Sequence, residues 1–222
     1  MQHILYPEMK YPTRYFVSIF KAIPCLFGTL GGTTLPLSYS LLPGKTTEHY
    51  VESFKAIDSY GPFEPETIMC DFERAIHAAI RQVWPSCTID CRYFHFKKSI
   101  WARLSSLGFS EEYKVLGSDV RTWFKKVGAM PFVHLGDVED AWEVLRSDCP
   151  ADLVEFADYF ESTWVSGRNN FDHYIWNKHD TVLAGLPRSN NAVEGWHNGF
   201  QQLVGHSNPT IWNFLNANEK RP

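Results

Sequence analysis

Apolar residues near the start of the chain follow the patterns of β-strands. Residues 15–20 are apolar, aromatic or β-branched apart from Ser18, and residues 25–30 form a second such run, which Gly31-Gly32 ends. Residues 35–41 alternate leucine or tyrosine with proline or serine, the pattern of a half-buried strand. We therefore predict three consecutive strands that form a meander.

The spacing of apolar residues then becomes helical. Tyr50, Phe54 and Ile57 recur at positions i, i+4 and i+7, and Thr46 or Thr47 precedes them as a possible N-cap. This pattern predicts a helix that begins just after the third strand.

A short apolar run, Ile68, Met69 and Cys70, predicts a buried fourth strand that ends at Asp71. Residues 72–84 carry apolar side chains at helical spacing before Pro85. A carboxylate at the carboxyl end of a strand is well placed to meet a ligand. Asp is also a favoured N-cap, so the sequence leaves both a functional and a capping role open for Asp71.

A fifth strand is predicted at residues 87–94, followed by a helix whose apolar face ends near Gly108. The predicted order of elements is three strands, then helix, strand, helix, strand and helix. This is the order of a ribonuclease-H-like mixed sheet flanked by helices, an α/β fold. From there on the patterns predict helices alone. The predicted helices are residues 111–116, 119–126, 138–146, 152–164, 190–204 and a last one from Asn208-Pro209.

We accordingly predict four parts of the chain. They are an irregular N-terminus at residues 1–14, a ribonuclease-H-like core at 15–109, an all-helical insertion at 110–180, and C-terminal helices at 181–222 that complete the core. Trp-rich surfaces of the insertion are either core or contacts of a homo-oligomer.

Composition narrows the classes of function. A formal net charge of −4 argues against a free-standing nucleic-acid-binding module. Local basic residues could contact DNA or form an ordinary solvated helix face. They are Lys97, Lys98, Arg103, Lys125 and Lys126. Five cysteines in a chain of this size fit an intracellular, reducing compartment, and no uninterrupted apolar stretch reaches the length of a membrane span.

A second acid of interest lies in Ser189-Asn190-Asn191-Ala192-Val193-Glu194-Gly195-Trp196-His197. If Asn191 caps the following helix, Glu194 is placed to complete a capping box. His197 lies three residues further on, on the same helix face as Glu194.

Four segments together resemble the transposase domain of Mutator-like elements. They are Asp71-Phe72-Glu73-Arg74-Ala75, Tyr93-Phe94-His95-Phe96 with Trp101, Asp158-Tyr159-Phe160 with Thr163-Trp164, and the segment from Asn190 to His197. Leu41-Leu42-Pro43-Gly44-Lys45 and the residues from Phe20 to Phe27 add to the resemblance, which extends from about Phe16 to Leu215.

The resemblance implies an enzyme that cuts and joins DNA with two Mg²⁺ or Mn²⁺ ions held by three carboxylates. Asp71 matches the second carboxylate and Glu194 the third. Asn191 and His197 match groups that position the acid or contact DNA. His95 is expected to pack near the edge of the active site. The implied location is nuclear or intracellular.

The chain departs from the family pattern at the first carboxylate, where Val17 stands in place of Asp. No acid lies between Glu8 and Glu48 to replace it. We therefore expect a truncated and catalytically impaired transposase domain. The alternative is a non-catalytic, transposase-derived domain that associates with DNA or with protein.

A second departure concerns the family's Cys-x-x-His pattern, since Arg92 stands at the cysteine position with Cys91 one residue earlier. In a regular strand Cys87, Cys91 and His95 would share one face, as in half of a zinc site. The opposing interpretation is a pair of buried thiols with a packed histidine.

Overall fold

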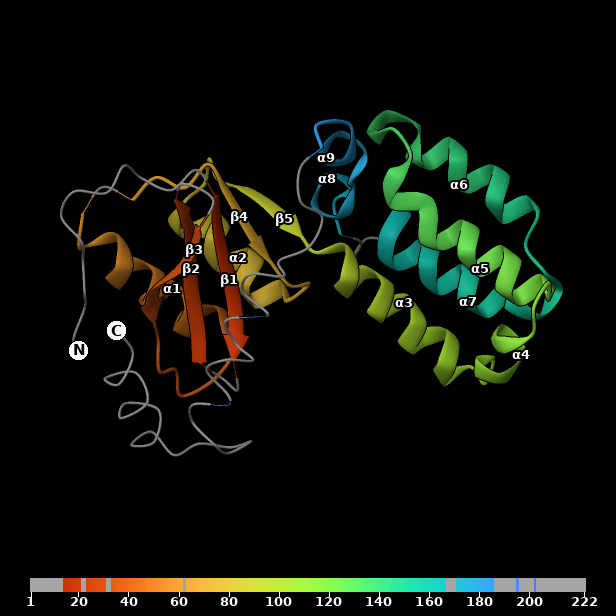
Figure 1. Cartoon of the computed structure of the whole chain (residues 1–222), viewed down its shortest axis with the longest axis horizontal. Coiled ribbons are helices and arrows are strands. Elements are labelled where there is room, and N and C mark those ends of the chain that lie inside the picture. Colours follow the sequence, from red (N-terminus) through yellow and green to blue (C-terminus); the bar gives the residue numbers. More distant parts are fainter. Residues whose placement is uncertain are drawn as a thin grey trace. The chain divides into compact units, whose positions relative to one another are not determined.

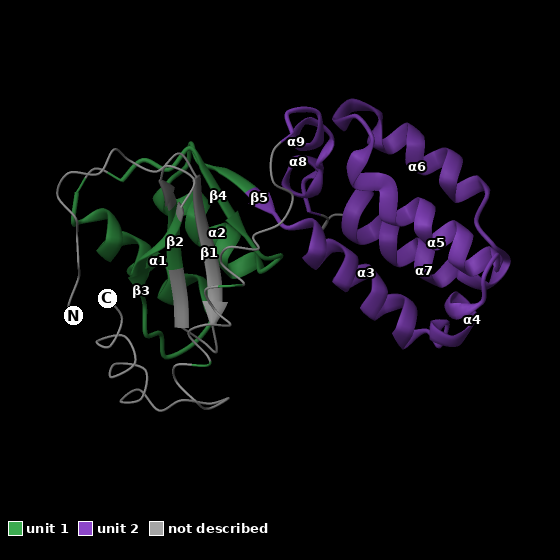
Figure 2. Cartoon of the chain, viewed as in Figure 1, with its two compact units in different colours: residues 1–89, 190–222 green, residues 90–189 purple. Residues whose placement is uncertain are grey.

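The computed structural model describes residues 14–20, 23–30, 33–61, 63–166 and 171–185, together with the single positions 195 and 202. By its internal contacts the chain divides into two units, residues 1–89 with 190–222 and residues 90–189 (Figure 2). The boundaries predicted from sequence for an insertion stay a prediction.

The strands form one mixed sheet in the order β3-β2-β1-β4-β5 (Figure 1). β1 and β2 are antiparallel, as are β2 and β3, whereas β1 and β4 are parallel. The strands are β1 Arg14–Phe20, β2 Ile23–Leu30, β3 Thr33–Tyr39, β4 Thr67–Cys70 and β5 Thr88–Cys91. The predicted meander and the predicted fourth strand are therefore confirmed.

Two helices, α1 (Thr47–Asp58) and α2 (Arg74–Val83), belong to the same unit as β4 and pack against each other. Thr46 caps α1 as predicted, since its side chain accepts a hydrogen bond from the His49 backbone N–H. Tyr50 and Phe54 of α1 are buried, and the Phe54 ring lies 5.1 Å from that of Trp84. Burial of these large rings is the main apolar contribution to this packing.

Residues 92–185 are helical wherever the structure describes an element. The helices are α3 Tyr93–Ser106, α4 Ser110–Lys114, α5 Asp119–Ala129, α6 Val138–Ser147, α7 Val154–Phe160, α8 His173–Trp176 and α9 His179–Leu183. Single 3₁₀ turns are η1 Met130–Phe132, η2 Leu135–Asp137 and η3 Ala151–Leu153, and a π-helical turn, η4 Glu161–Val165, follows α7. The helices predicted in this region are confirmed, with ends that differ by a few residues.

Aromatic rings fill the core of this helical unit. Phe96 of α3 is fully buried and lies edge-on to Trp164 at 4.9 Å and stacked with Trp176 at 5.7 Å. Trp123 and Trp142 are also buried, and Trp123 Nε1 donates a hydrogen bond of 2.9 Å to the Leu145 carbonyl. These tryptophans are therefore core residues and not the surface contacts that the sequence left open.

The structure corrects one predicted element. The fifth strand was expected to continue to Phe94, but β5 ends at Cys91 and α3 begins at Tyr93. The Tyr93 hydroxyl donates a hydrogen bond to the Gly128 carbonyl, and its ring packs on Phe132 at 4.9 Å. Contacts with residues far along the chain thus fix the start of this helix, and local propensity could not reveal them.

No helix in the described part of the chain has both the length and the apolar character that crossing a bilayer requires.

Candidate functional site

Asp71 directly follows β4, at the carboxyl end of that strand, and is half-buried. β4 pairs in parallel with β1, with Tyr15 opposite Ile68 and Phe16 opposite Met69. Two residues beyond the Phe16–Met69 pair, Asp71 is level with Ser18 of β1, which continues to Phe20. Ligands of open α/β sheets bind at the carboxyl ends of strands.

The backbone around Asp71 forms a tight turn before α2. Its carbonyl oxygen accepts a hydrogen bond of 2.8 Å from the Glu73 backbone N–H and one of 2.9 Å from His77 Nε2. Two donors on one carbonyl fix the orientation of the Asp71 peptide, because each bond restrains the same oxygen. The carboxylate is therefore attached to a restrained position of the main chain.

The capping role that the sequence left open for Asp71 is wrong. α2 begins at Arg74 and its N-cap residue is Glu73, whose side chain makes no capping hydrogen bond. Asp71 precedes that N-cap by two residues, and its backbone accepts bonds of the turn instead. The functional role of this carboxylate stays a prediction.

Val17 lies on β1, level with Cys70, the last residue of β4 before Asp71. Its backbone pairs with Leu26 of β2, and the preceding residue, Phe16, pairs with Met69. The sequence of β1, Arg-Tyr-Phe-Val-Ser-Ile-Phe, contains no carboxylate. An acid at residue 17 would lie within one strand spacing of the end of β4, about 4.8 Å. That position 17 corresponds to the first acid of the family stays a prediction.

The remaining predicted site residues divide between two cases. Glu194, Asn191 and His197 lie outside the described residues, so their assigned roles stay predictions. His95 is described and is half-buried in the first turn of α3, where its ring meets that of Phe94 edge-on at 5.4 Å. The expectation that Cys87, Cys91 and His95 share a strand face is wrong, because α3 has replaced the strand at His95.

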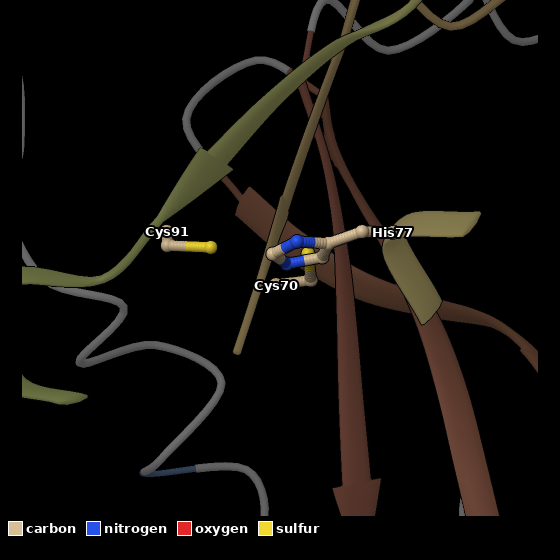
Figure 3. A group of neighbouring side chains, drawn as sticks. All are labelled: Cys70, His77 and Cys91. Carbon is tan, nitrogen blue, oxygen red and sulfur yellow. The ribbon is translucent and has the colours of Figure 1, made fainter. Parts of the chain in front are cut away.

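A different group of three potential ligands lies beside Asp71. One ligand atom from each of Cys70, His77 and Cys91 can be chosen so that all three lie within 4.8 Å of one another. Figure 3 shows the Cys91 sulfur pointing toward the His77 imidazole. Cys70 and Cys91 are fully buried thiols and His77 is 3% exposed.

Sequence reasoning missed this group because its members stand far apart along the chain. Cys70 ends β4, Cys91 ends β5 and His77 lies on the buried face of α2 beside Ile76 and Ile80. The one indication of this group in the sequence was His77, a histidine on the apolar face of an amphipathic helix. The site could be recognised only once the pairing of β4 with β5 was known.

Asp90 is the one strand carboxylate of the described sheet, and it already has a cationic partner. The Lys178 ammonium contacts its Oδ1, and the Lys178 side chain is 1% exposed. A carboxylate neutralised by a buried ammonium is a poor ligand for a second cation. Asp90 therefore does not replace the acid absent at Val17.

The basic residues considered for DNA contact are partly neutralised. Arg103 pairs with Glu155 at 2.9 Å and Lys126 pairs with Asp148 at 2.6 Å. Burial and the neighbouring Lys125 lower the pKa of Lys97, whose ammonium lies over the Phe124 ring. These contacts favour the interpretation of an ordinary helix surface over that of a phosphate-binding patch.

Comparison with known proteins gives one family. Residues 12–99 match the model of the MULE transposase domain. This span contains β1 to β5, the start of α3, and both Val17 and Asp71. No curated protein matches the chain.

Proposed function

Because residues 12–99 match the model of the MULE transposase domain, we propose that the chain derives from an enzyme that cut and joined DNA by metal-assisted phosphoryl transfer. We further propose that Val17 removes most of this activity. Transposon ends are the implied DNA partner. The family likeness is also the ground for placing the ancestral activity in the nucleus.

The arrangement of the sheet supports a ribonuclease-H-like active site. An antiparallel meander of β1 to β3, with β4 added in parallel beside β1, brings the end of β4 beside Val17 in the middle of β1. Asp71 follows β4 directly, and the N-cap residue of α2 is Glu73. The observation that carries the proposal is this position of Asp71 beside Val17.

The residues present do not supply the full ligand set for two Mg²⁺ or Mn²⁺ ions. Such hard cations prefer several carboxylate oxygens, and the family resemblance assigns three acids to the pair. Asp71 and Glu194 match the second and third of these acids. At the position of the first acid, Val17 contributes a hydrocarbon side chain. Cleavage by the unmodified chain is therefore expected to be very weak.

The test is nicking of supercoiled duplex DNA in the presence of Mn²⁺. The unmodified chain is compared with Val17→Asp and with Val17→Asp/Asp71→Asn. Metal charge stabilisation is worth several kcal/mol, so Val17→Asp should raise the rate by on the order of 100-fold or more. Asp71→Asn should abolish the gain.

The controls separate loss of chemistry from loss of folding. Val17→Asn introduces a polar group of nearly equal size without the negative charge and should leave the chain inactive. Nicking by the unmodified chain at the rate of Val17→Asp would show that the proposed loss of activity is wrong.

A second candidate function is that of a non-catalytic domain that associates with a protein or with DNA. The ion pairs of Arg103 and Lys126 favour a protein over DNA as its partner. Binding of a labelled duplex without metal, titrated with salt, distinguishes the two. A steep fall of affinity with salt indicates phosphate contacts, and absence of binding removes the DNA alternative.

A further inference from the structure

We propose that Cys70, His77 and Cys91 form a structural zinc site next to Asp71. Two thiols and an imidazole are the ligand types that zinc selects. Their ligand atoms lie within 4.8 Å of one another. The site does not depend on whether the chain cleaves DNA.

The three side chains need little movement to bind one ion. Zinc bonds of about 2.3 Å to sulfur and about 2.0 Å to nitrogen place tetrahedral ligand atoms roughly 3.5 to 3.8 Å apart. For the ring nitrogen that meets this limit, the cluster is about 1 Å too open at its longest separation, a distance that side-chain rotation covers. The ligands come from β4, β5 and α2, so secondary structure holds each of them in place.

The hydrogen bond of His77 selects the form of the ring that binds metal. A carbonyl oxygen only accepts, so Nε2 carries the proton that it shares with the Asp71 carbonyl at 2.9 Å. The lone pair of the ring is then on Nδ1, which is a common zinc ligand. Donation of the other N–H to a backbone carbonyl is the usual way in which metal-bound histidines are oriented.

Charge identifies zinc rather than monovalent copper. The three residues are buried, with exposed fractions of 0%, 3% and 0%, and an uncompensated charge there is costly. Two thiolates and a neutral imidazole around Zn²⁺ carry no net charge, whereas the same ligands around Cu⁺ carry one negative charge. Binding releases the two thiol protons to solvent, so affinity should fall as the pH is lowered.

The site would connect the zinc ion to the candidate catalytic acid. Zinc holds Nδ1 of His77, Nε2 of the same ring holds the Asp71 carbonyl, and the Asp71 carboxylate projects from that peptide. A fourth ligand is not supplied by the three residues and is left to a small molecule such as water. The role proposed for zinc is structural, since it acts on Asp71 only through His77.

The experiment measures zinc bound to the purified full chain after denaturation, chelation and refolding with Zn²⁺. One zinc per chain is expected for the unmodified protein and for the control Cys149→Ser, which removes a half-buried thiol that is not part of the group. Cys70→Ser and Cys91→Ser should each weaken binding by on the order of 100-fold or more, beyond the effect of an outer-shell change.

Cobalt provides a second measurement that needs no variant. Co²⁺ bound to the unmodified chain should show sulfur-to-cobalt charge transfer of a strength that corresponds to two thiolates, and Zn²⁺ should displace it. Zinc should also raise the melting temperature of this chain. A folded chain that binds no zinc, or cobalt spectra without thiolate bands, would overturn the proposal even if the serine variants do not fold.

Discussion

The phenol of Tyr50 donates a hydrogen bond of 2.8 Å to Oε1 of Glu73 and so joins α1 to the residue that precedes α2. Tyr50 is fully buried. The bond explains why the Glu73 side chain does not cap its own helix, since that side chain reaches toward α1. It also fixes the far end of the turn that begins at Asp71, because the Glu73 N–H is bonded to the Asp71 carbonyl.

Tyr50→Phe should therefore destabilise the chain. The substitution keeps the buried ring but removes the donor to a carboxylate, which costs about 1 to 2 kcal/mol of unfolding free energy. Urea denaturation measures the loss. Tyr60→Phe is the control, because Tyr60 is 47% exposed and its substitution should change stability by less than about 0.5 kcal/mol. Equal effects of both substitutions would show that the Tyr50–Glu73 bond contributes nothing.

Substitution of Asp71 should leave α2 intact. Since Glu73 is the N-cap, Asp71→Ala should leave the start of α2 unchanged, whereas Thr46→Ala removes the side-chain cap of α1. A lost cap of this kind costs about 1 kcal/mol. Both variants lie in the same unit, so one denaturation experiment compares them. A larger cost for Asp71→Ala would mean that its carboxylate has a structural role, which would weaken its assignment to catalysis.

The Cys87 thiol should make stability depend on pH in alkaline solution. Burial is the main cause that raises its pKa from 9.0 to about 11. The unfolded state then loses the thiol proton at lower pH than the folded state, so unfolding becomes easier as the pH rises. The contribution is complete below about pH 9 and is lost as the pH rises through 11.

Comparison with Cys87→Ala isolates this contribution. Between pH 8 and the folded-state pKa, the free energy of unfolding of the unmodified chain should fall by roughly 2 kcal/mol more than that of the variant. The variant is nevertheless less stable at pH 8, because the substitution leaves a cavity. Guanidinium denaturation at successive pH values measures both. Parallel curves for the two proteins would contradict the assignment to Cys87.

Local patterns predicted those elements whose boundaries depend on neighbouring residues. Thr46, Tyr50 and Phe54 lie within one helix, and their spacing gave both its cap and its buried face. The three strands of the meander were predicted in the same way, from runs that end at turn residues. Where apolar periodicity and turn chemistry agree, the sequence determines the element.

Features that depend on distant contacts were not predictable in this way. The aromatic run at Tyr93 favoured a longer fifth strand, and only its packing against Phe132 and Gly128 explains the helix found there. Likewise Cys70, His77 and Cys91 have no spacing typical of a metal site and meet only because α2 and the two strands pack together. The position of Asp71 was foreseen, whereas the hydrogen bonds that restrain its peptide were not.

Asp90 and Lys178 form a buried ion pair whose two members should respond differently to substitution. The Lys178 side chain is 1% exposed and that of Asp90 is 20% exposed. Asp90→Asn leaves an ammonium in the core without its counter-charge, which costs about 3 to 5 kcal/mol. Lys178→Met replaces the cation by an apolar chain of similar length and leaves a carboxylate that still reaches water. Lys178→Met should therefore be the milder change.

Chemical denaturation of both variants and of the double variant measures this asymmetry. Asp90→Asn/Lys178→Met should recover most of the stability that Asp90→Asn loses, because no buried charge is left without a partner. Asp180→Asn is the control, since Asp180 also contacts a possible cation, His179 at 2.8 Å, but is 90% exposed. This substitution should change the free energy of unfolding by no more than about 0.5 kcal/mol. If Asp90→Asn is as mild as Asp180→Asn, the Asp90 carboxylate does not hold Lys178 in place. Asp90 would then be available as a metal ligand, and the reason for excluding it as a substitute for the acid absent at Val17 would be lost.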